Sequence, residues 1–207
     1  MAARPLFVNV VLFRLADDTL QVLLASAPSG WELTGCELDE GEDLEQAAER
    51  AIARLLDRRK TYLEQLFTYS GSGSGPVRVA YFAIIPAEAH QVTGRPARWL
   101  AVSPAPRMNP DDATILEYAL RRLRYKLEYS AVGFQLLPAE FTLSELQHTY
   151  ELVLDERLDK RNFRRRILQS GIIEDTSHLH TGEGRPARLY RYRPDAVAEV
   201  KARRLFP

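Results

Sequence analysis

The apolar residues in the first half of the chain fall into short runs that predict β-strands, interrupted by one helical repeat. Residues 6–15 (LFVNVVLFRL) are rich in β-branched and aromatic side chains, and LQVLLAS follows the turn ADDT at once, so these two segments predict a hairpin. From Leu44 to Leu56 the apolar residues recur with helical spacing. Further strands are predicted at residues 30–33, 62–70, 77–86 and 97–103, with the flexible sequence GSGSG (71–75) as a hairpin tip.

The segment SPAPRMNP (103–110) is the predicted domain boundary, because it holds three prolines in eight residues. A chain of 207 residues accommodates two domains. We expect one domain at residues 1–108, a linking helix at 109–130 capped by Asp111 or Asp112, and a second domain at 131–207. The helix carries a narrow seam of leucines. Such a helix either packs on its own domain or links two domains or two subunits, and the pattern leaves both interpretations open. The seam consists of Leu116, Leu120, Leu123 and Leu127.

The second domain shows the order of elements of a winged helix-turn-helix. Thr142 and Glu145 form a Ser/Thr-x-x-Glu capping box ahead of an apolar helix. The short turn DERL leads to Asp159, a good N-cap for KRNFRRRILQS, and Gly171 ends that helix. GIIEDTS, HLHTGEGRPA and RLYRYRP then predict strand, loop and strand. Helix, tight turn, basic helix and β-hairpin are the parts of a winged helix-turn-helix in their order.

The positive charge of the chain is concentrated in this second domain. The formal net charge is zero, but residues 160–193 hold nine basic and three acidic side chains. Residues 1–110, by contrast, hold 11 basic and 13 acidic side chains. A local positive surplus of this kind is typical of a surface that binds phosphates.

A helical wheel places Phe163 and Ile167 of the basic helix on its core face, with Asn162, Arg165 and Gln169 roughly opposite. Arginine and asparagine or glutamine side chains match guanine and adenine edges in the major groove, and flanking arginines suit phosphates. A solvated basic face is the alternative, but the capped helix before it and the hairpin after it favour DNA binding. The predicted DNA-binding side chains are Thr142, Ser144, Lys160, Arg161, Asn162, Arg164, Arg165, Arg166, Gln169, Arg185 and Arg188.

The helix predicted at residues 44–56 lies in a stretch that partly matches the motif G-x5-E-x7-R-E-U-x-E-E-x-G-U of Nudix hydrolases, in which U is aliphatic. Glu42 and Arg50 stand at the first glutamate and at the arginine. The other carboxylates of that motif hold the divalent cations that activate water, and this chain lacks them. The substitutions are Cys36 for the first glycine, Ala51 for a glutamate, Arg54 and Leu55 for the glutamate pair, and Asp57 for the last glycine. We expect no hydrolysis by the usual mechanism, and the alternative is a weakly active hydrolase that uses Glu42, Glu45 and Glu49.

Both halves together resemble the Nudix-related transcriptional regulators, or NrtR family, over nearly the whole chain. The most specific stretches are RLRYKLEYSAVGFQLLPAEFTLSELQHTYELVL, LDKRNFRRRILQSGIIE and GRPARLYRY. The resemblance implies an α/β fold, a Nudix-like α/β/α sandwich with a mixed sheet that senses a small molecule, followed by a winged helix-turn-helix. It also implies a homodimer that binds a palindromic operator in double-stranded DNA, usually as a repressor.

The resemblance further implies a link to NAD metabolism through ADP-ribose or a related nucleotide, although similar branches sense sugars or sugar phosphates. Family members often carry basic residues at the end of the second strand, whereas this chain has Ala25, Ser26 and Ala27. Because an unpaired pyrophosphate in a pocket is costly, other cations would have to compensate. The candidate ligand-binding side chains are Arg14, Glu42, Arg50, Arg54 and Arg78.

The remaining chemistry of the sequence indicates neither a metal nor a cofactor. His178 and His180 lack cysteine or carboxylate partners at ligand spacing, and Tyr190 and Tyr192 alternate as structural strand residues. Cys36 is the only cysteine, which excludes an intramolecular disulfide and fits a reducing compartment. The apolar run near the N-terminus is too short to span a bilayer. We therefore expect a cytoplasmic protein without a membrane partner.

Overall fold

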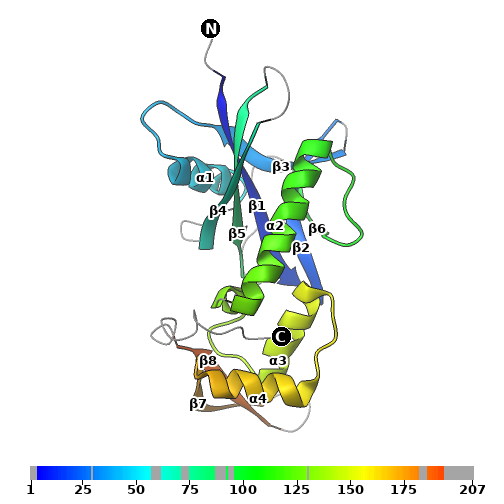
Figure 1. Cartoon of the computed structure of the whole chain (residues 1–207), viewed down its shortest axis with the longest axis vertical. Helices are drawn as coiled ribbons and strands as arrows, with labels where there is room; N and C mark the ends of the chain where they lie inside the picture. Colours follow the sequence, from blue (N-terminus) through cyan, green and yellow to red (C-terminus); the bar gives the residue numbers. More distant parts are fainter. Residues whose placement is uncertain are drawn as a thin grey trace. The chain divides into compact units, whose positions relative to one another are not determined.

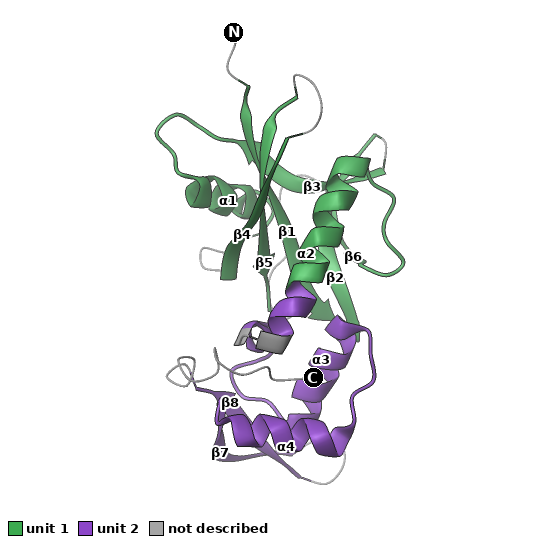
Figure 2. Ribbon diagram, viewed as in Figure 1, with its two compact units in different colours: residues 1–122 green, residues 123–207 purple. Residues whose placement is uncertain are grey.

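The computed structural model describes residues 4–28, 30–56, 62–70, 75–86, 92, 96–129, 131–181 and 186–193. The chain divides into two compact units, residues 1–122 and 123–207 (Figure 2). The division falls inside the long helix α2 (Pro110–Tyr129). Most of the predicted hairpin tip GSGSG, at residues 71–74, lies outside the described residues.

A six-stranded mixed sheet forms the centre of the first unit, in the order β4-β5-β1-β3-β2-β6 (Figure 1). β1 pairs in parallel with β5 and antiparallel with β2 and β3, so the predicted hairpin of β1 and β2 is confirmed. Its turn residues Asp17 and Asp18 both have φ of 52°, as in the tight turns that suit the twist of paired strands. The strands are β1 Leu6–Ala16, β2 Thr19–Ala27, β3 Gly30–Glu37, β4 Tyr62–Ser70, β5 Val77–Ile84 and β6 Ala97–Ala101.

Strand β3 is longer than the predicted residues 30–33 because Gly35 interrupts the apolar pattern without interrupting the strand. A Cβ atom at Gly35 would lie 2.5 Å from both the Phe7 ring and the Val8 carbonyl oxygen. The close packing of β1 on β3 therefore requires glycine here. Strand prediction from apolar side chains stops at Gly35, because glycine has no side chain to contribute to the pattern.

Helix α1 (Leu44–Ala53) covers one face of the sheet. Ala47, Ala48 and Ala51 are fully buried against that face, where their small side chains let the helix backbone come close to the strands. The helix ends earlier than the predicted limit at Leu56. Leu55 and Leu56 are buried as well, but they lie in the turn that follows the helix, so the apolar spacing continues beyond the helical backbone.

The first part of α2 covers the opposite face of the sheet. Successive side chains of a strand point to opposite sides, and Val79 and Tyr81 of β5 belong to the cluster around α1. Arg78, which precedes Val79 and so points the other way, donates a hydrogen bond from Nη1 to Oδ1 of Asp112 in α2 at 2.8 Å. The first unit is thus an α/β/α sandwich with a mixed sheet, as the resemblance noted in the sequence implies.

Asn109, rather than Asp111 or Asp112, caps α2. The Asn109 side chain accepts a hydrogen bond from the Asp112 amide at 2.9 Å, and Pro110 occupies the first helical position, where a missing N–H has no cost. Asp112 has a different role. Its carboxylate is 2 % exposed and accepts hydrogen bonds from Arg78 and from the Leu33 amide, the latter at 2.9 Å.

The leucine seam of α2 is buried at Leu116, Leu123 and Leu127, whereas Leu120 is half-buried. In the first unit, Ile115 and Ala119 are fully buried beside Leu116. The seam therefore continues from the first unit, with Leu116 and Leu120, into the second, with Leu123 and Leu127.

The second unit is a three-element helical layer followed by a β-hairpin. The capping box of Thr142 and Glu145 is confirmed, and so are the N-cap Asp159 and the ending at Gly171, which has φ of 67°. Its core contains Tyr150 of α3 and Phe163 of α4, whose rings meet edge to face at 5.5 Å. The elements are η1 Ala131–Leu136, α3 Leu143–Leu154, α4 Lys160–Ser170, β7 Ile173–His180 and β8 Ala187–Tyr192.

Replacing Asp112 with alanine should destabilise the first unit by about 2–3 kcal/mol, because Arg78 and the Leu33 amide would both lose a buried, charged acceptor. Chemical denaturation of the variant and the wild type measures this difference. The matched control is Asp111→Ala, which removes the hydrogen bond from the Tyr69 hydroxyl and a carboxylate in the first turn of α2, and should cost at most about 1 kcal/mol. Equal losses for the two variants would contradict the role assigned to Asp112.

Candidate functional site

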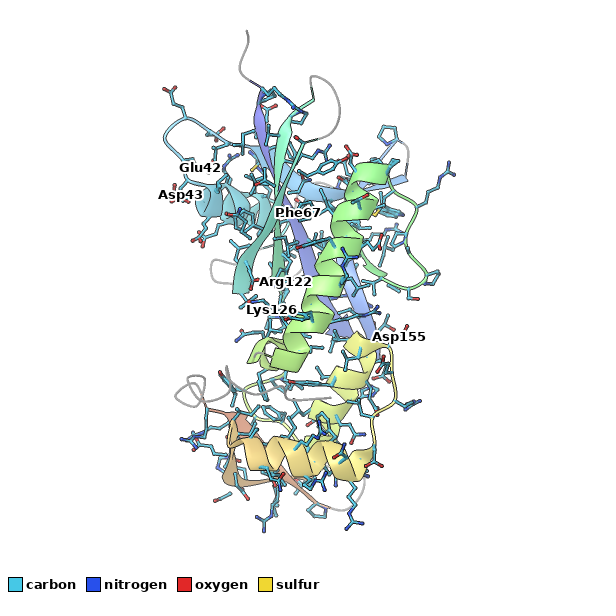
Figure 3. The ribbon with its side chains drawn as sticks, viewed as in Figure 1. Glu42, Asp43, Phe67, Arg122, Lys126 and Asp155 are labelled. Atoms are coloured by element: carbon cyan, nitrogen blue, oxygen red, sulfur yellow. The ribbon has the colours of Figure 1, made fainter. Side chains whose placement is uncertain are left out.

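Two buried side chains fix the orientation of the basic helix α4. Phe163 and Ile167 are 2 % and 0 % exposed, as the helical wheel predicts. The Asp159 carboxylate accepts a hydrogen bond from the Asn162 amide at 2.8 Å and so fixes the start of the helix. The opposite face of α4 is therefore held towards solvent, and long side chains project from it (Figure 3).

Helix α4 carries five basic side chains and no acidic one. Arg165 and Gln169 are exposed, and Arg165 donates a hydrogen bond from Nη2 to Oδ1 of Asn162 at 2.8 Å. This bond holds the guanidinium beside the amide, so two side chains able to recognise bases form one ordered group. Of the flanking cations, Lys160 and Arg161 are exposed, whereas Arg164 and Arg166 are both partly buried.

The start of α3 contributes one further polar group to this surface. Ser144 is exposed, and its Oγ accepts a hydrogen bond from Nη2 of Arg164 at 3.0 Å. Thr142, in contrast, is 6 % exposed, and its hydroxyl is used in the capping box with the Glu145 amide. Ser144 is therefore the side chain of this turn that is open to solvent, whereas the Thr142 hydroxyl is buried in the capping box.

The β-hairpin carries ion pairs that the sequence does not reveal. Arg188 is exposed and pairs with Asp175 at 2.7 Å, and the amide of Ser177 followed by Arg188 lowers the pKa of the Asp175 carboxyl. His178 contacts the carboxylate of Glu140 at 3.0 Å. Arg185, another predicted DNA contact, lies outside the described residues, as does the surrounding glycine-rich loop at 182–185.

Tyr190 and Tyr192 have the structural roles that the sequence predicts. The Tyr192 ring stacks on Phe134 at 4.8 Å, and the backbone of Tyr190 exchanges two hydrogen bonds with that of Phe141. Within the described part of the chain, no group of three or more histidine, cysteine or acidic side chains is placed to hold a metal ion. No helix of that part is long and apolar enough to cross a membrane.

In the first unit, the residues that match the Nudix motif form an ion pair at the start of α1. Arg50 donates to the two carboxylate oxygens of Glu42 at 2.8 and 2.6 Å, and to the Glu37 carbonyl oxygen at 2.8 Å. Asp39 lies 3.1 Å from the same guanidinium. Cys36, at the position of the first glycine of the motif, is buried and donates from Sγ to the Ala47 carbonyl oxygen. These contacts join the loop before α1 to the helix.

A hollow of about 440 Å³ lies beside this ion pair, at the N-terminal end of α1, where Figure 3 labels Glu42 and Asp43. It is lined by Leu38, Glu42, Asp43, Leu44, Glu45 and Tyr81. Three carboxylates at its rim make it unfavourable for a pyrophosphate, whose charge has the same sign. The hollow is better suited to a neutral, hydroxyl-bearing part of a ligand.

The five predicted ligand-binding residues do not form one cluster. Only Glu42 and Arg50 are in direct contact, and Arg54 is exposed at the C-terminal end of α1. Arg78 pairs with Asp112 on the α2 face of the sheet. Arg14 stacks over the Trp99 ring at 4.3 Å and donates to Gln21, and its partial burial lowers the pKa of its guanidinium.

Comparisons with known proteins agree with this geometry. A family model described as the NrtR DNA-binding winged helix domain matches residues 133–192. The "ADPR responsive transcriptional repressor NtrR" of Acinetobacter baylyi is 32% identical over 201 residues, which cover 89% of this chain and 80% of that protein.

Two solved structures are also similar. The crystal structure of Shewanella oneidensis NrtR complexed with a 27mer DNA has a TM-score of 0.82 and 33% identity, covering 96% of each chain. The NUDIX domain of the same Shewanella protein, complexed with ADP ribose, has a TM-score of 0.51 and 29% identity, covering 59% of this chain and 90% of that domain.

The ion pair at the start of α1 should make stability depend on pH in the acid range. The guanidinium of Arg50 lowers the pKa of the Glu42 carboxyl from 4.5 to about 2. A carboxyl with a depressed pKa in the folded state stabilises the fold above its ordinary pKa, and this contribution is lost as the pH falls through the folded value. The difference in thermal midpoint between the wild type and Arg50→Gln should therefore shrink between pH 4.5 and about pH 2.

The matched control is Arg54→Gln, which removes a neighbouring exposed arginine and should show a much smaller pH-dependent difference. A carbon-detected NMR titration measures the pKa of the Glu42 carboxyl directly. A midpoint near 4.5 in the wild type would contradict the ion pair as described.

Proposed function

Because the chain belongs to the NrtR family of Nudix-related transcriptional regulators, we propose that it is a DNA-binding transcriptional repressor whose first unit senses ADP-ribose without hydrolysing it. The observation that carries this proposal is the exposed face of α4, where base-reading side chains and phosphate-binding cations lie on a helix fixed by two buried residues. The relatives support both parts, since one is named as an ADPR responsive repressor and another was solved with DNA. As a DNA-binding regulator, the chain acts in the cytoplasm, where its operator is.

The side chains of the second unit divide between base contacts and phosphate contacts. Asn162, Arg165 and Gln169 read base edges, because they stand opposite the buried face of α4. Arg188 reaches a phosphate only by exchanging its partner Asp175, so its contribution to affinity is smaller than that of an unpaired arginine. The phosphate contacts are Ser144, Lys160, Arg161, Arg164, Arg166 and Arg185.

The operator is palindromic, and the chain binds it as a homodimer, because two copies of one helix read two inverted half-sites. The effector changes operator affinity only if it binds the DNA-free and DNA-bound arrangements differently. Helix α2 transmits this difference, since it is the continuous element that begins in the sensing unit and ends in the DNA-binding unit.

For the pyrophosphate of ADP-ribose, the available positive charge comes from Arg14 and Arg54. Within the described residues, Arg50 and Arg78 already form ion pairs, whereas no such pair is formed by Arg14 or Arg54. These two arginines compensate for the uncharged residues at positions 25–27. If Arg14 and Arg54 do not bind the pyrophosphate, the acidic hollow beside Glu42 favours the second candidate effector, a sugar or sugar phosphate bound through its hydroxyl groups.

Hydrolysis is not part of the proposed function. Ala51, Arg54 and Leu55 stand where the Nudix motif has metal-binding glutamates, and Glu42 is held by Arg50. A weak hydrolase built on Glu42, Glu45 and Glu49 would release phosphate-containing products from nucleotide diphosphates in the presence of magnesium. That assay separates the alternative from the sensor.

Replacing Arg165 with alanine should weaken binding to the preferred operator by about 1–3 kcal/mol and relax base preference at one position of each half-site. The matched control is Arg161→Ala, a phosphate contact on the same helix. It should weaken all sequences alike and reduce the slope of log affinity against log salt concentration by about one. Fluorescence anisotropy with operator variants at several salt concentrations measures both effects. An unchanged base preference in Arg165→Ala would refute its assigned role.

Purified full-length protein should bind DNA from upstream of its own gene, and ADP-ribose should release it. ADP-ribose should also stabilise the protein thermally, by about 2.7 kcal/mol at roughly 100 times its dissociation constant. Arg54→Ala and Arg14→Ala should weaken this response while leaving DNA binding intact. DNA binding without any response to ADP-ribose would redirect the effector to sugars, and a failure to bind DNA would overturn the proposed function.

A further inference from the structure

One apolar side chain stands within the basic face of α4. Leu168 is 50 % exposed, whereas the other branched apolar residue of this helix, Ile167, is fully buried. Among the described residues, only Tyr125 and Leu179 are comparably exposed large hydrophobic side chains. A single exposed leucine is ordinary by itself, but its surroundings on the helix are informative.

The position of Leu168 places it among the groups that face DNA. With 3.6 residues per turn, Leu168 lies about 20° from Arg161 and about 60° from Arg165 on the helical wheel. Arg164, one turn before it, is drawn towards α3 by its hydrogen bond to Ser144. Leu168 therefore lies at the edge of the outward face of α4, where its neighbours on the wheel are Arg161 on one side and Arg164 on the other.

The charge around Leu168 restricts what it contacts. The helix residues 160–170 contain five basic and no acidic side chains, so the complementary surface is anionic. Beside these cations, the exposed Leu168 side chain is best matched by an apolar group on the same anionic partner. The major groove of DNA offers this combination, because phosphates line its edges and the C5 methyl group of thymine projects into it.

We propose that Leu168 contacts the C5 methyl group of a thymine in each operator half-site and is thereby a specificity-determining residue. The proposal rests on the proposed function, in which α4 lies in the major groove. Arg165 and Asn162 then select bases through hydrogen bonds, and Leu168 adds an apolar selection at a neighbouring base pair. Cytosine carries no methyl group at that position, so a cytosine there leaves the leucine without its contact.

The test removes the methyl group from the DNA rather than the side chain from the protein. The probe is the tightest duplex that the full-length wild type selects from a random library, with each thymine replaced in turn by deoxyuridine. Deoxyuridine retains every hydrogen-bonding group of thymine and lacks only the methyl. We expect one thymine per half-site at which the replacement weakens wild-type binding roughly threefold to fivefold, the range for one buried methyl group.

Leu168→Ala should bind the thymine and deoxyuridine duplexes equally, while Leu168→Met should retain part of the discrimination. The matched control is Leu179→Ala, which removes a similarly exposed leucine from β7 and should discriminate as the wild type does. Because residue 168 is half-exposed, Leu168→Ala should fold normally, and circular dichroism verifies this.

The outcomes separate this inference from the function on which it rests. Sequence-specific binding with no thymine at which the wild type prefers the methyl group would leave the repressor intact and overturn the role of Leu168. Discrimination by Leu168→Ala as strong as that of the wild type would overturn that role in the same way. No sequence-specific binding to any selected duplex would overturn the proposed function, and the inference with it.

Discussion

The DNA-binding surface depends on the burial of Phe163 and Ile167, and the Phe163 ring packs on that of Tyr150. The helix has five cations and no acidic residue, so these two buried side chains are the main determinant of which way it faces. Rotating α4 enough to bury an arginine would expose a phenylalanine and desolvate a charge, both of which are costly. The capping carboxylate of Asp159 fixes where the helix begins, and the left-handed Gly171 fixes where it ends. Orientation and register together give each polar side chain a defined position.

The arginines of the two units are used in different ways. In the first unit, Arg50, Arg78 and Arg122 each pair with a carboxylate, so their charge holds the structure together. On α4, Arg165 and Arg164 donate hydrogen bonds to neutral oxygens of Asn162 and Ser144. Those bonds orient the guanidinium groups without neutralising them, which leaves their full charge for an anionic partner. The same residue type thus stabilises one unit and prepares the other for binding.

The sequence predicts the local features of this protein well, because each depends on residues close together in the chain. The hairpin of β1 and β2, the capping box of α3, and the face of α4 are all of this kind. The sequence does not predict contacts between distant residues. Local spacing indicates Asp111 or Asp112 as the cap of α2, but a buried ion pair to Arg78 takes the Asp112 carboxylate, and Asn109 caps the helix instead. No local pattern in the sequence reveals that β5 places Arg78 beside Asp112.

The same limit applies to the sites. Spacing along one helix predicts that Asn162, Arg165 and Gln169 share a face, since helical geometry relates their directions. The candidate ligand residues come from two strands, one helix and the loop before that helix. Only the fold shows that Arg78 lies on the α2 face of the sheet, whereas Arg50 lies on α1. The contact of His178 with Glu140 escapes prediction for the same reason, because the two residues are far apart in the sequence.

In the altered Nudix motif at α1, an arginine takes the place of the metal ion as the source of positive charge. Carboxylates gathered at one place repel one another unless a cation lies between them, and a hydrolase supplies a metal ion for this purpose. Here Arg50 supplies the positive charge from within the chain, and the low pKa of Glu42 follows from that pairing. Ala51 and Leu55 are buried, so they replace repulsion between charges with apolar packing. A site built in this way keeps its shape without a metal ion, and shape is the property that a sensor of small molecules needs.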